Sequence, residues 1–429
     1  MKNIGTTFFA YFLCVSAVVT GLAGCEEKGN NVGLLRSNDN TFYYAINNRD
    51  AIKRFSPIMY NRTDSLHQVE RFKLVHISDP HLSGWSIDNH YAHPINLIES
   101  VTFANQEELK INAMVETGDH ISRTSAKDAR NWMTSFFRFL YQNNRIPTFS
   151  CYGNHDANID NKEDYITANE LGANVQYYKN HPIQKPGVDR SYYYADVPNP
   201  QGGVVRIIAL DMLDQPGNEY NTLHYAVFSQ EQIDWLGNVA LKEEMTHRHS
   251  VIILTHFPVQ ISAWGGKSPG GMDASGTPFY LYDGNFTYTW SVIPDIVEAF
   301  RTRSSVQRNY PNIVYPNHRG IQADFDFTNA AGEFVCYLGG HVHCFALFDV
   351  RGTSDTLPPQ KMIICTNQSP SEAGSVYNKV VRKESSLISN SFNMYAIDTH
   401  EKKVYITFFG ACIPFDAPTA PTILEFSYL

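Results

Sequence analysis

Short apolar runs alternate with amphipathic stretches along the chain after residue 70. The run at 72–78 predicts a buried strand, and the spacing of apolar positions over 95–110 predicts a helix after it. The same order continues with a strand at 111–119, a helix at 128–144 and a strand at 146–154. Strands that alternate with helices indicate an α/β protein built from β-α-β units, in which helices pack on the faces of a sheet.

The second half of the chain predicts further strands at 204–211, 249–257 and 333–341. Between the first two of these, Ser229 and Gln232 have the spacing of a capping box at the start of an amphipathic helix. The alternation of strands and helices therefore extends over most of the chain.

Two later regions have patterns of their own. The runs at 392–399 and 402–411 flank a polar turn and predict an antiparallel hairpin. The interval 258–332 begins with a long Gly-rich and aromatic-rich stretch and continues with a helix-like pattern at 291–303. A loop region of this length inside a compact domain is usually functional or disordered, so we interpret the interval as an insert.

Five of the predicted strands end on side chains of the kind that bind metals. In chain order these residues are Asp79, His81, Asp119, Asn154, His155, Asp156, His256, His341 and His343. Ligands of open α/β sheets bind beyond the carboxyl ends of the strands, so the five segments can converge on one crevice. A single Asp-x-His is more simply a polar turn after a core strand, but the five segments together favour a metal site.

The ligand types indicate which metals such a site would hold. Carboxylate, imidazole and amide oxygen suit manganese, iron or zinc, and the lack of thiolates argues against a purely structural zinc site. Two aspartates, four histidines and an asparagine exceed the needs of one ion, whereas two ions bridged by one carboxylate would use them all. Two such ions, roughly 3.5–4 Å apart, can bind both a nucleophilic water and the oxygens of a phosphoryl group.

The order D-x-H, G-D, G-N-H-D, H and G-H-x-H resembles that of the calcineurin-like metallophosphoesterase superfamily, over about residues 72–350. The resemblance implies a four-layer αββα sandwich of two mixed sheets and hydrolysis of a phosphoester by a metal-bound hydroxide. It implies that one metal is held by Asp79, His81 and His343, the second by Asn154, His256 and His341, and that Asp119 bridges them. His155 matches the family's non-ligand histidine, which stabilises the transition state or protonates the leaving oxygen.

The sequence differs from the motifs of two branches of the superfamily, which indicates that the chain is less similar to those branches. Ser122 stands three residues after Asp119, where the iron-tyrosine purple acid phosphatases have a tyrosine and the protein phosphatases have an aspartate that orients the catalytic histidine. Asp156 is then a candidate for orienting His155. The segment ISDPHL, at 77–82, is closer to the class III cyclic-nucleotide phosphodiesterases and related bacterial phosphoesterases. Phosphomonoesters and phosphodiesters, including nucleotides and sugar phosphates, both remain open as substrates.

The N-terminus has the layout of a secretory signal, with Lys2, a long apolar stretch and small residues at its end. The ending at 22–25 resembles the bacterial lipoprotein signal, in which Cys25 would carry lipid; an uncleaved transmembrane anchor is the alternative. We expect a protein tethered by lipid outside the cytoplasm, in the periplasm or on the cell surface. The predicted organisation is a signal at 1–24, a tether and N-terminal segment at 25–70, a core at 71–350 with its insert, and strands at 351–429 that complete the second sheet.

Composition limits the partners. The net charge of -9 leaves no basic face for nucleic acid, so nucleic acid is not expected as a bulk partner. The five cysteines beyond residue 25 are odd in number and lack C-x-x-C spacing, which predicts core residues instead of a disulfide framework. A non-catalytic binding lipoprotein with the same fold is the alternative function. Its expected mark is the loss of a ligand, and no ligand is missing.

Several histidines have a simpler interpretation than ligation. His76 lies inside the first predicted strand, where a structural histidine with satisfied hydrogen bonds is the better interpretation. The histidines without a motif position are interpreted as surface or packing residues: His120, His224, His247, His249 and His318.

Overall fold

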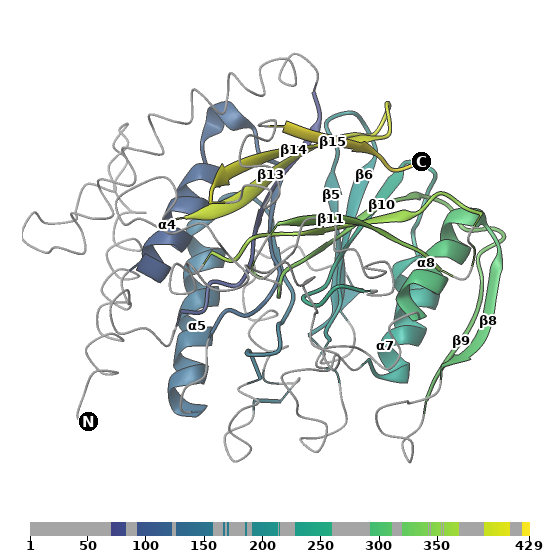
Figure 1. Ribbon diagram of the computed structural model, residues 1–429, viewed down its shortest axis with the longest axis horizontal. Coiled ribbons are helices and arrows are strands. Elements are labelled where there is room, and N and C mark those ends of the chain that lie inside the picture. The colour runs from purple at the N-terminus through teal and green to yellow at the C-terminus, as the bar shows by residue number, and fades with distance from the viewer. Residues whose placement is uncertain are drawn as a thin grey trace, which may run out of the picture.

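In a computed structural model of the chain, two mixed sheets form the centre of the protein (Figure 1). The structure describes residues 70–82, 92–121, 126–157, 166–167, 170, 185–186, 191–212, 214, 228–259, 292–310, 320–341, 343, 345–352, 354, 356–368, 390–411 and 423–429. The predicted signal, most of the tether, Ser122 and residues 260–291 of the insert lie outside these ranges.

The first sheet has the strand order β15-β14-β13-β1-β2-β3. Its parallel strands are β1 (Phe72–Ile77), β2 (Ala113–Glu116) and β3 (Thr148–Ser150). The helices α4 (Ala92–Ala104) and α5 (Ala126–Asn143) lie between them in the sequence, with the short 3-10 turn η3 (Glu107–Leu109) after α4. The β-α-β alternation predicted for this part of the chain is therefore confirmed.

The second sheet has the order β11-β12-β10-β7-β6-β5-β4. Its parallel strands are β6 (Val204–Ala209), β7 (His249–Leu254), β10 (Glu333–Gly339) and β12 (Gln360–Ile364). Antiparallel strands extend both edges: β4 (Lys185–Pro186), β5 (Tyr193–Pro198) and β11 (Ala346–Val350). Between β6 and β7 lies α7 (Gln230–Trp235), continued by the π-helical turn η5 (Leu236–Ala240). Ser229 caps α7 and accepts a hydrogen bond from the Gln232 N–H at 3.0 Å, as the spacing predicts.

The two sheets pack face to face over a shared apolar core. One buried cluster contains Leu74 and Phe149 from the first sheet together with Ile207, Leu254 and Leu338 from the second. A second cluster joins the outer face of the second sheet to α7 and to α8 (Val292–Thr302). In Figure 1, α4 and α5 lie on one side of the paired sheets, and α7 and α8 on the other. The predicted αββα sandwich is confirmed.

The insert contributes an element that the sequence pattern did not predict. Beyond α8, which matches the helix-like pattern at 291–303, β8 (Ser305–Tyr310) and β9 (Ile321–Asp326) form a separate two-stranded antiparallel sheet. Alternate residues of β9 are buried, and the Phe325 ring lies so close to Gly237 that a Cβ there would be 2.5 Å from its nearest atom. The ribbon therefore packs on the helical segment α7–η5.

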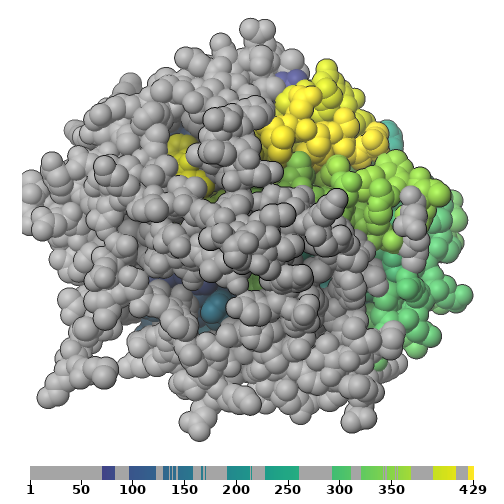
Figure 2. All heavy atoms as spheres, in the orientation of Figure 1, coloured from purple at the N-terminus to yellow at the C-terminus, as the bar shows by residue number. Residues whose placement is uncertain are grey.

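The C-terminal strands correct one expectation. The predicted hairpin forms, with β13 (Ser391–Asp398) antiparallel to β14 (Lys403–Gly410), and β15 (Ile423–Ser427) pairs with β14. These strands join the first sheet through β1, so the expectation that 351–429 completes the second sheet is wrong except for β12. The reason is burial: β1 and β13 are buried along their whole length, and β13 pairs with the edge of β1 that β2 leaves open. The exposed end of the sheet, coloured yellow, reaches the surface in Figure 2.

Within the described ranges, no helix combines the length and apolar character that crossing a membrane requires.

Candidate metal centre

The carboxyl ends of five strands from both sheets meet at the predicted ligands. Backbone hydrogen bonds join the segments beyond these ends: Asp79 N–H donates to Gly118 O at 3.0 Å, and His81 N–H donates to Asp119 O at 3.0 Å. Within the second sheet, Gly340 N–H donates to His256 O at 3.0 Å, and from the second sheet to the first, His341 N–H donates to Asp79 Oδ2 at 3.1 Å. The segments that carry the ligands are therefore fixed to one another before any ion binds.

The backbone at these strand ends is unusual. Asp79, His81, Asp119, His341 and His343 have φ angles of 51°, 46°, 58°, 69° and 57°. Residues other than glycine rarely adopt this left-handed region, and each instance costs on the order of 1–3 kcal/mol unless its surroundings hold it. Five of the predicted ligands share this conformation, which turns their side chains toward a common point.

Glycines leave room for the close approach of the ligand segments. A Cβ on Gly118 would lie 2.8 Å from His256 Nδ1, and Gly118 itself has a φ of 93°. A Cβ on Gly340 would lie 2.5 Å from Asp79 Oδ2. The glycines that precede Asp119 and His341 in the motifs are thus required by the packing of one ligand segment on another.

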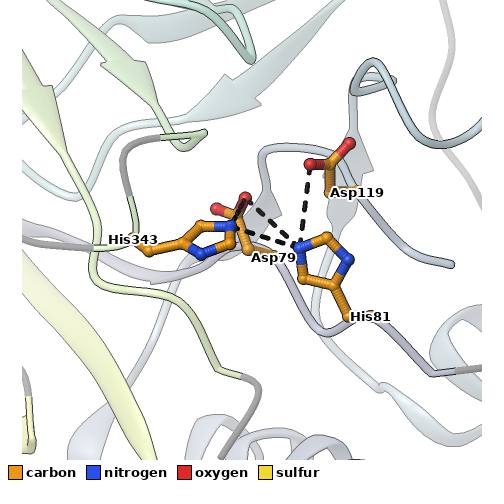
Figure 3. Close-up of side chains that lie close together, drawn as sticks. All are labelled: Asp79, His81, Asp119 and His343. Carbon is orange, nitrogen blue, oxygen red and sulfur yellow. Dashed lines mark hydrogen bonds and ion pairs between the residues drawn. The ribbon is translucent and has the colours of Figure 1, made fainter. Parts of the chain in front are cut away.

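One group of potential ligand atoms comes from Asp79, His81, Asp119 and His343 (Figure 3). One atom from each lies within 4.8 Å of all the others. His343 Nε2 is 3.2 Å from Asp79 Oδ1 and 3.2 Å from His81 Nε2, while His81 Nε2 is 3.8 Å from Asp119 Oδ2. Two carboxylate oxygens and two imidazole nitrogens that face one another are a donor set for a divalent transition metal.

A second group comes from Asp119, His256 and His341, with one atom of each again within 4.8 Å of the others. Asn154 belongs with them, because its Oδ1 is 3.0 Å from His256 Nε2 and 3.1 Å from His341 Nδ1. His256 Nδ1 lies 2.7 Å from the Thr117 carbonyl and donates to it, which leaves Nε2 facing Asn154 Oδ1 and Asp119 Oδ2. Oxygens and ring nitrogens that converge in this way are a donor set for a divalent cation.

The electrostatics of the second group point the same way. Burial alone would lower the pKa of His256, but the Asp119 carboxylate at 3.2 Å outweighs it and raises this pKa to about 9. Burial alone would also raise the pKa of Asp119, yet the surrounding His256, His155 and His81 hold it well below its usual range. The buried carboxylate therefore requires positive charge around it, which protons supply in the metal-free protein and metal ions can supply in their place.

Asp119 is the one residue common to both groups. Its Oδ2 lies 3.2 Å from His256 Nε2 and 3.8 Å from His81 Nε2. Its Oδ1 accepts a hydrogen bond from the His155 backbone N–H at 2.9 Å. This is the position that a bridging carboxylate would occupy.

His155 is more exposed than the shared carboxylate beside it. Its side chain is 23% exposed, whereas the Asp119 side chain is 1% exposed. His155 Nε2 lies 4.0 Å from Asp119 Oδ2, and its ring centroid lies 5.1 Å from that of His81. The ring therefore lies beside the ligand groups and is partly accessible to solvent.

The expectation that Asp156 orients the His155 ring is wrong, because the Asp156 carboxylate has other partners. Asp156 Oδ2 instead accepts hydrogen bonds from His120 Nδ1 at 2.7 Å, Gly153 N–H at 2.7 Å and Asp119 N–H at 3.0 Å. The carboxylate is therefore occupied in tying the segment that carries Asp119 to the segment that carries Asn154.

His120 is the residue that sequence reasoning undervalued. Its ring is fully buried between two carboxylates, with Nδ1 bonded to Asp156 and Nε2 paired with Glu116. Burial opposes the charged ring, but the two carboxylates outweigh it and raise the pKa of His120 to about 10. Only the spacing of Glu116 and His120 is visible in the sequence, and Asp156 comes from another strand end.

The residues interpreted as structural or core residues are mostly buried. His76 is buried and has a partner at each ring nitrogen, as expected for a structural histidine. His249 is buried and His247 exposed. Cys151, Cys336 and Cys365 are buried free thiols, which confirms their assignment to the core.

A comparison with family models matches residues 72–289 to the model described as calcineurin-like phosphoesterase. The match spans about half of the 429 residues and contains Asp79, His81, Asp119, Asn154 and His256. A search of curated proteins found no match.

Proposed function

Because the chain belongs to the calcineurin-like phosphoesterase family, we propose that it hydrolyses a small phosphoester with two divalent metal ions held at the strand ends. The observation that carries the proposal is the pair of ligand groups that share Asp119. A shared carboxylate between two sets of imidazole and oxygen donors is what a two-metal site requires.

The donor set fits two ions of manganese, iron or zinc. Asp79, His81 and His343 would hold one ion, Asp119 would bridge, and the second ion would be held by Asn154, His256 and His341. When bound, such ions activate water and neutralise charge on phosphoryl oxygens.

His155 is the residue proposed to act on the substrate itself. It is partly exposed, and its Nε2 lies 4.0 Å from the shared carboxylate of Asp119. From this position its ring can donate a hydrogen bond to a phosphoryl oxygen or a proton to the leaving oxygen. The backbone N–H of His155 donates to Asp119 Oδ1 at 2.9 Å, which fixes the residue relative to the metal groups.

For the substrate we propose a small-molecule phosphomonoester or phosphodiester, with nucleotides and sugar phosphates as the first classes to test. The segment at 77–82 favours a phosphodiester as the substrate, because this segment resembles the cyclic-nucleotide phosphodiesterases more than the purple acid phosphatases. The formal charge of -9 argues against a nucleic acid polymer as substrate.

We further propose that the protein acts outside the cytoplasm, anchored through lipid on Cys25. The support is the sequence at 1–25, whose basic start, apolar stretch and final small residues have the layout of a lipoprotein signal. Metabolic labelling of the protein with a fatty acid, or inhibition of the peptidase that cleaves lipoprotein signals, tests the proposed lipid anchor. Loss of labelling in Cys25→Ser supports it, and unchanged labelling contradicts it.

The catalytic proposal is tested with a panel of phosphomonoesters, phosphodiesters and sugar-nucleotide pyrophosphates. The full chain is loaded with Mn²⁺, Zn²⁺ or Fe²⁺ in turn, and phosphate or alcohol release is measured. Metal-dependent turnover that a chelator abolishes is the expected result. A folded, metal-loaded protein that turns over no member of the panel contradicts the proposal and favours a binding role.

A further inference from the structure

A continuous series of buried hydrogen bonds connects β13 to the ligand Asp79. The Tyr395 hydroxyl is 2.8 Å from His76 Nδ1, and His76 Nε2 is 2.9 Å from Thr117 Oγ1. Thr117 Oγ1 donates to Ser78 Oγ at 2.8 Å, and Ser78 Oγ donates to Asp79 Oδ2 at 2.5 Å. All five side chains are at most 1% exposed. We call these five residues the Tyr395 network.

The direction of every bond in the network follows from its carboxylate end. An ionised carboxylate only accepts, so Ser78 must use its single hydroxyl proton on Asp79. Thr117 must then donate to Ser78, and His76 Nε2 must donate to Thr117. A neutral imidazole that donates from Nε2 accepts at Nδ1, so the Tyr395 hydroxyl donates there.

The contacts of Tyr395, at the end of the network away from Asp79, fit the same direction of donation. Asn393 Nδ2 donates to the Tyr395 hydroxyl oxygen at 3.0 Å, which leaves the phenolic proton for His76. Burial lowers the pKa of His76 to about 3, against the opposing effect of Asp79, so its ring is neutral. The donors at one end and the carboxylate at the other therefore select a single tautomer of His76.

The network treats the two oxygens of Asp79 differently. Oδ2 receives the Ser78 hydroxyl, whereas Oδ1 faces His343 Nε2 at 3.2 Å and His81 Nε2 at 4.0 Å. The His341 backbone N–H lies at similar distances from both oxygens, 3.2 and 3.1 Å, so it does not distinguish them. The Ser78 hydroxyl therefore distinguishes the two oxygens, because it donates to Oδ2 while Oδ1 faces the ligand group.

We propose that Tyr395, His76, Thr117 and Ser78 are positioning residues that present Asp79 Oδ1 as the single metal-binding oxygen of this carboxylate. The inference rests on the proposed two-metal function. Hydrogen-bond partners of metal ligands orient them and tune their affinity, and their loss typically costs about 10–100-fold in metal binding. Because the network ends on Asp79, it acts on the ion held by Asp79, His81 and His343 and leaves the other ion unaffected.

The first test measures the tautomer of His76 and needs no metal. In the full chain labelled with ¹⁵N at histidine, NMR of the ring nitrogens identifies the His76 signal by its loss in His76→Asn. A neutral ring protonated at Nε2 is expected near neutral pH. A ring protonated at Nδ1, or at both nitrogens, reverses at least one bond of the network and overturns the proposal.

The second test measures the affinities of the two ions by competition of Zn²⁺ with a chromogenic chelator. Thr117→Val removes the hydroxyl but keeps the carbonyl that accepts from His256 Nδ1, and Tyr395→Phe removes only the phenolic hydroxyl. Each variant is expected to weaken one Zn²⁺ equivalent by about 10–100-fold and to leave the other unchanged. Thr117→Ser restores the hydroxyl and should restore the affinity.

Tyr405→Phe is the matched control, since Tyr405 lies on the neighbouring strand β14 and its hydroxyl bonds to Glu401 at 3.3 Å, outside the network. Both Zn²⁺ equivalents should keep their affinity in this control. Retention of both affinities in Thr117→Val and Tyr395→Phe overturns the proposal, even if the wild-type protein hydrolyses phosphoesters. Conversely, absence of hydrolysis with selective loss of one Zn²⁺ equivalent supports the positioning role and contradicts the proposed function.

Discussion

The His120 ring is held 2.7 Å from the carboxylate of Asp156, although the two residues come from different strand ends. Glu116 pairs with the opposite ring nitrogen, so one buried cation lies between two buried carboxylates. The aromatic rings of Phe136 and Phe137, with centroids 4.5 and 4.9 Å from that of His120, close the site from α5. The cluster of Glu116, His120 and Asp156 therefore holds the segment that carries Asp119 against the segment that carries Asn154.

His120→Gln should therefore destabilise the protein strongly. The neutral amide leaves the buried carboxylate of Asp156 without a cation, while Glu116, whose pKa burial already raises to about 7, takes up a proton. Breaking a buried ion pair typically costs about 3–5 kcal/mol. Urea unfolding measures the loss, with the exposed His247→Gln as the matched control. A variant that unfolds at the same urea concentration as wild type would show that the cluster does not hold the ligand segments.

Glu99 predicts how stability depends on pH. Burial, against a weaker hydrogen bond from Asn390, raises the pKa of this carboxyl on α4 from 4.5 to about 8. A raised folded-state pKa means that the folded protein binds the proton more tightly than the unfolded chain. The contribution of protonated Glu99 to the free energy of unfolding is fully present below pH 4.5. It is lost as the pH rises toward 8, by roughly 1.4 kcal/mol for each pH unit at most.

Glu99→Gln should remove this contribution, because an amide cannot lose a proton in this range. The free energy of unfolding of wild type relative to the variant is expected to fall between pH 4.5 and about 8. Glu108→Gln, at an exposed position, is the control and should leave the wild-type pH profile unchanged. A constant difference between wild type and Glu99→Gln across this range contradicts the role of Glu99.

The alternation of strands and helices predicted an α/β protein, and the resemblance to the superfamily implied the αββα sandwich. Local signals at the strand ends identified the site residues. An apolar run followed by Asp79 or His256 is a local signal, because a buried strand and the polar residue after it are neighbours in the chain. Parallel strands then bring their carboxyl ends to the same edge. Geometry that depends on neighbours, such as the left-handed backbone of Asp79, has no local signal of this kind.

What could not be predicted depends on partners that are distant in sequence. The strand β8 is mostly polar and exposed, so its pairing with β9 and their packing on α7 leave little periodicity to recognise. The hairpin at 392–411 was recognisable, but its sheet was not, because pairing with β1 spans more than 300 residues. Asp156 likewise acts on His120, 36 residues away, and not on its neighbour His155.

Asp119→Asn tests the shared ligand. A neutral amide bridges two cations poorly, so metal content and turnover should fall together. Elemental analysis of the purified variant measures the first and a phosphoester assay the second. Asp324→Asn, on the exposed face of β9, is the control and should keep both. Two full metal equivalents with normal turnover in Asp119→Asn would remove this residue from the bridging position.

His155→Ala separates catalysis from metal binding. The ring is 23% exposed and belongs to neither ligand group, so both metals should remain when it is removed. Loss of a group that donates a proton or a hydrogen bond to the reacting phosphoester should lower turnover by about 10²–10⁴-fold.

The deficit should also depend on the leaving group. A phosphoester whose leaving alcohol is acidic departs without protonation, so His155→Ala should lose less activity on an activated aryl phosphoester than on an alkyl one. Turnover of both substrates by wild type and variant, at equal metal content, measures this difference. An equal deficit on the two substrates would assign His155 to stabilisation of the phosphoryl oxygens and not to protonation of the leaving oxygen. Loss of one whole metal equivalent would instead favour His155 as a ligand and contradict its role as a non-ligand residue.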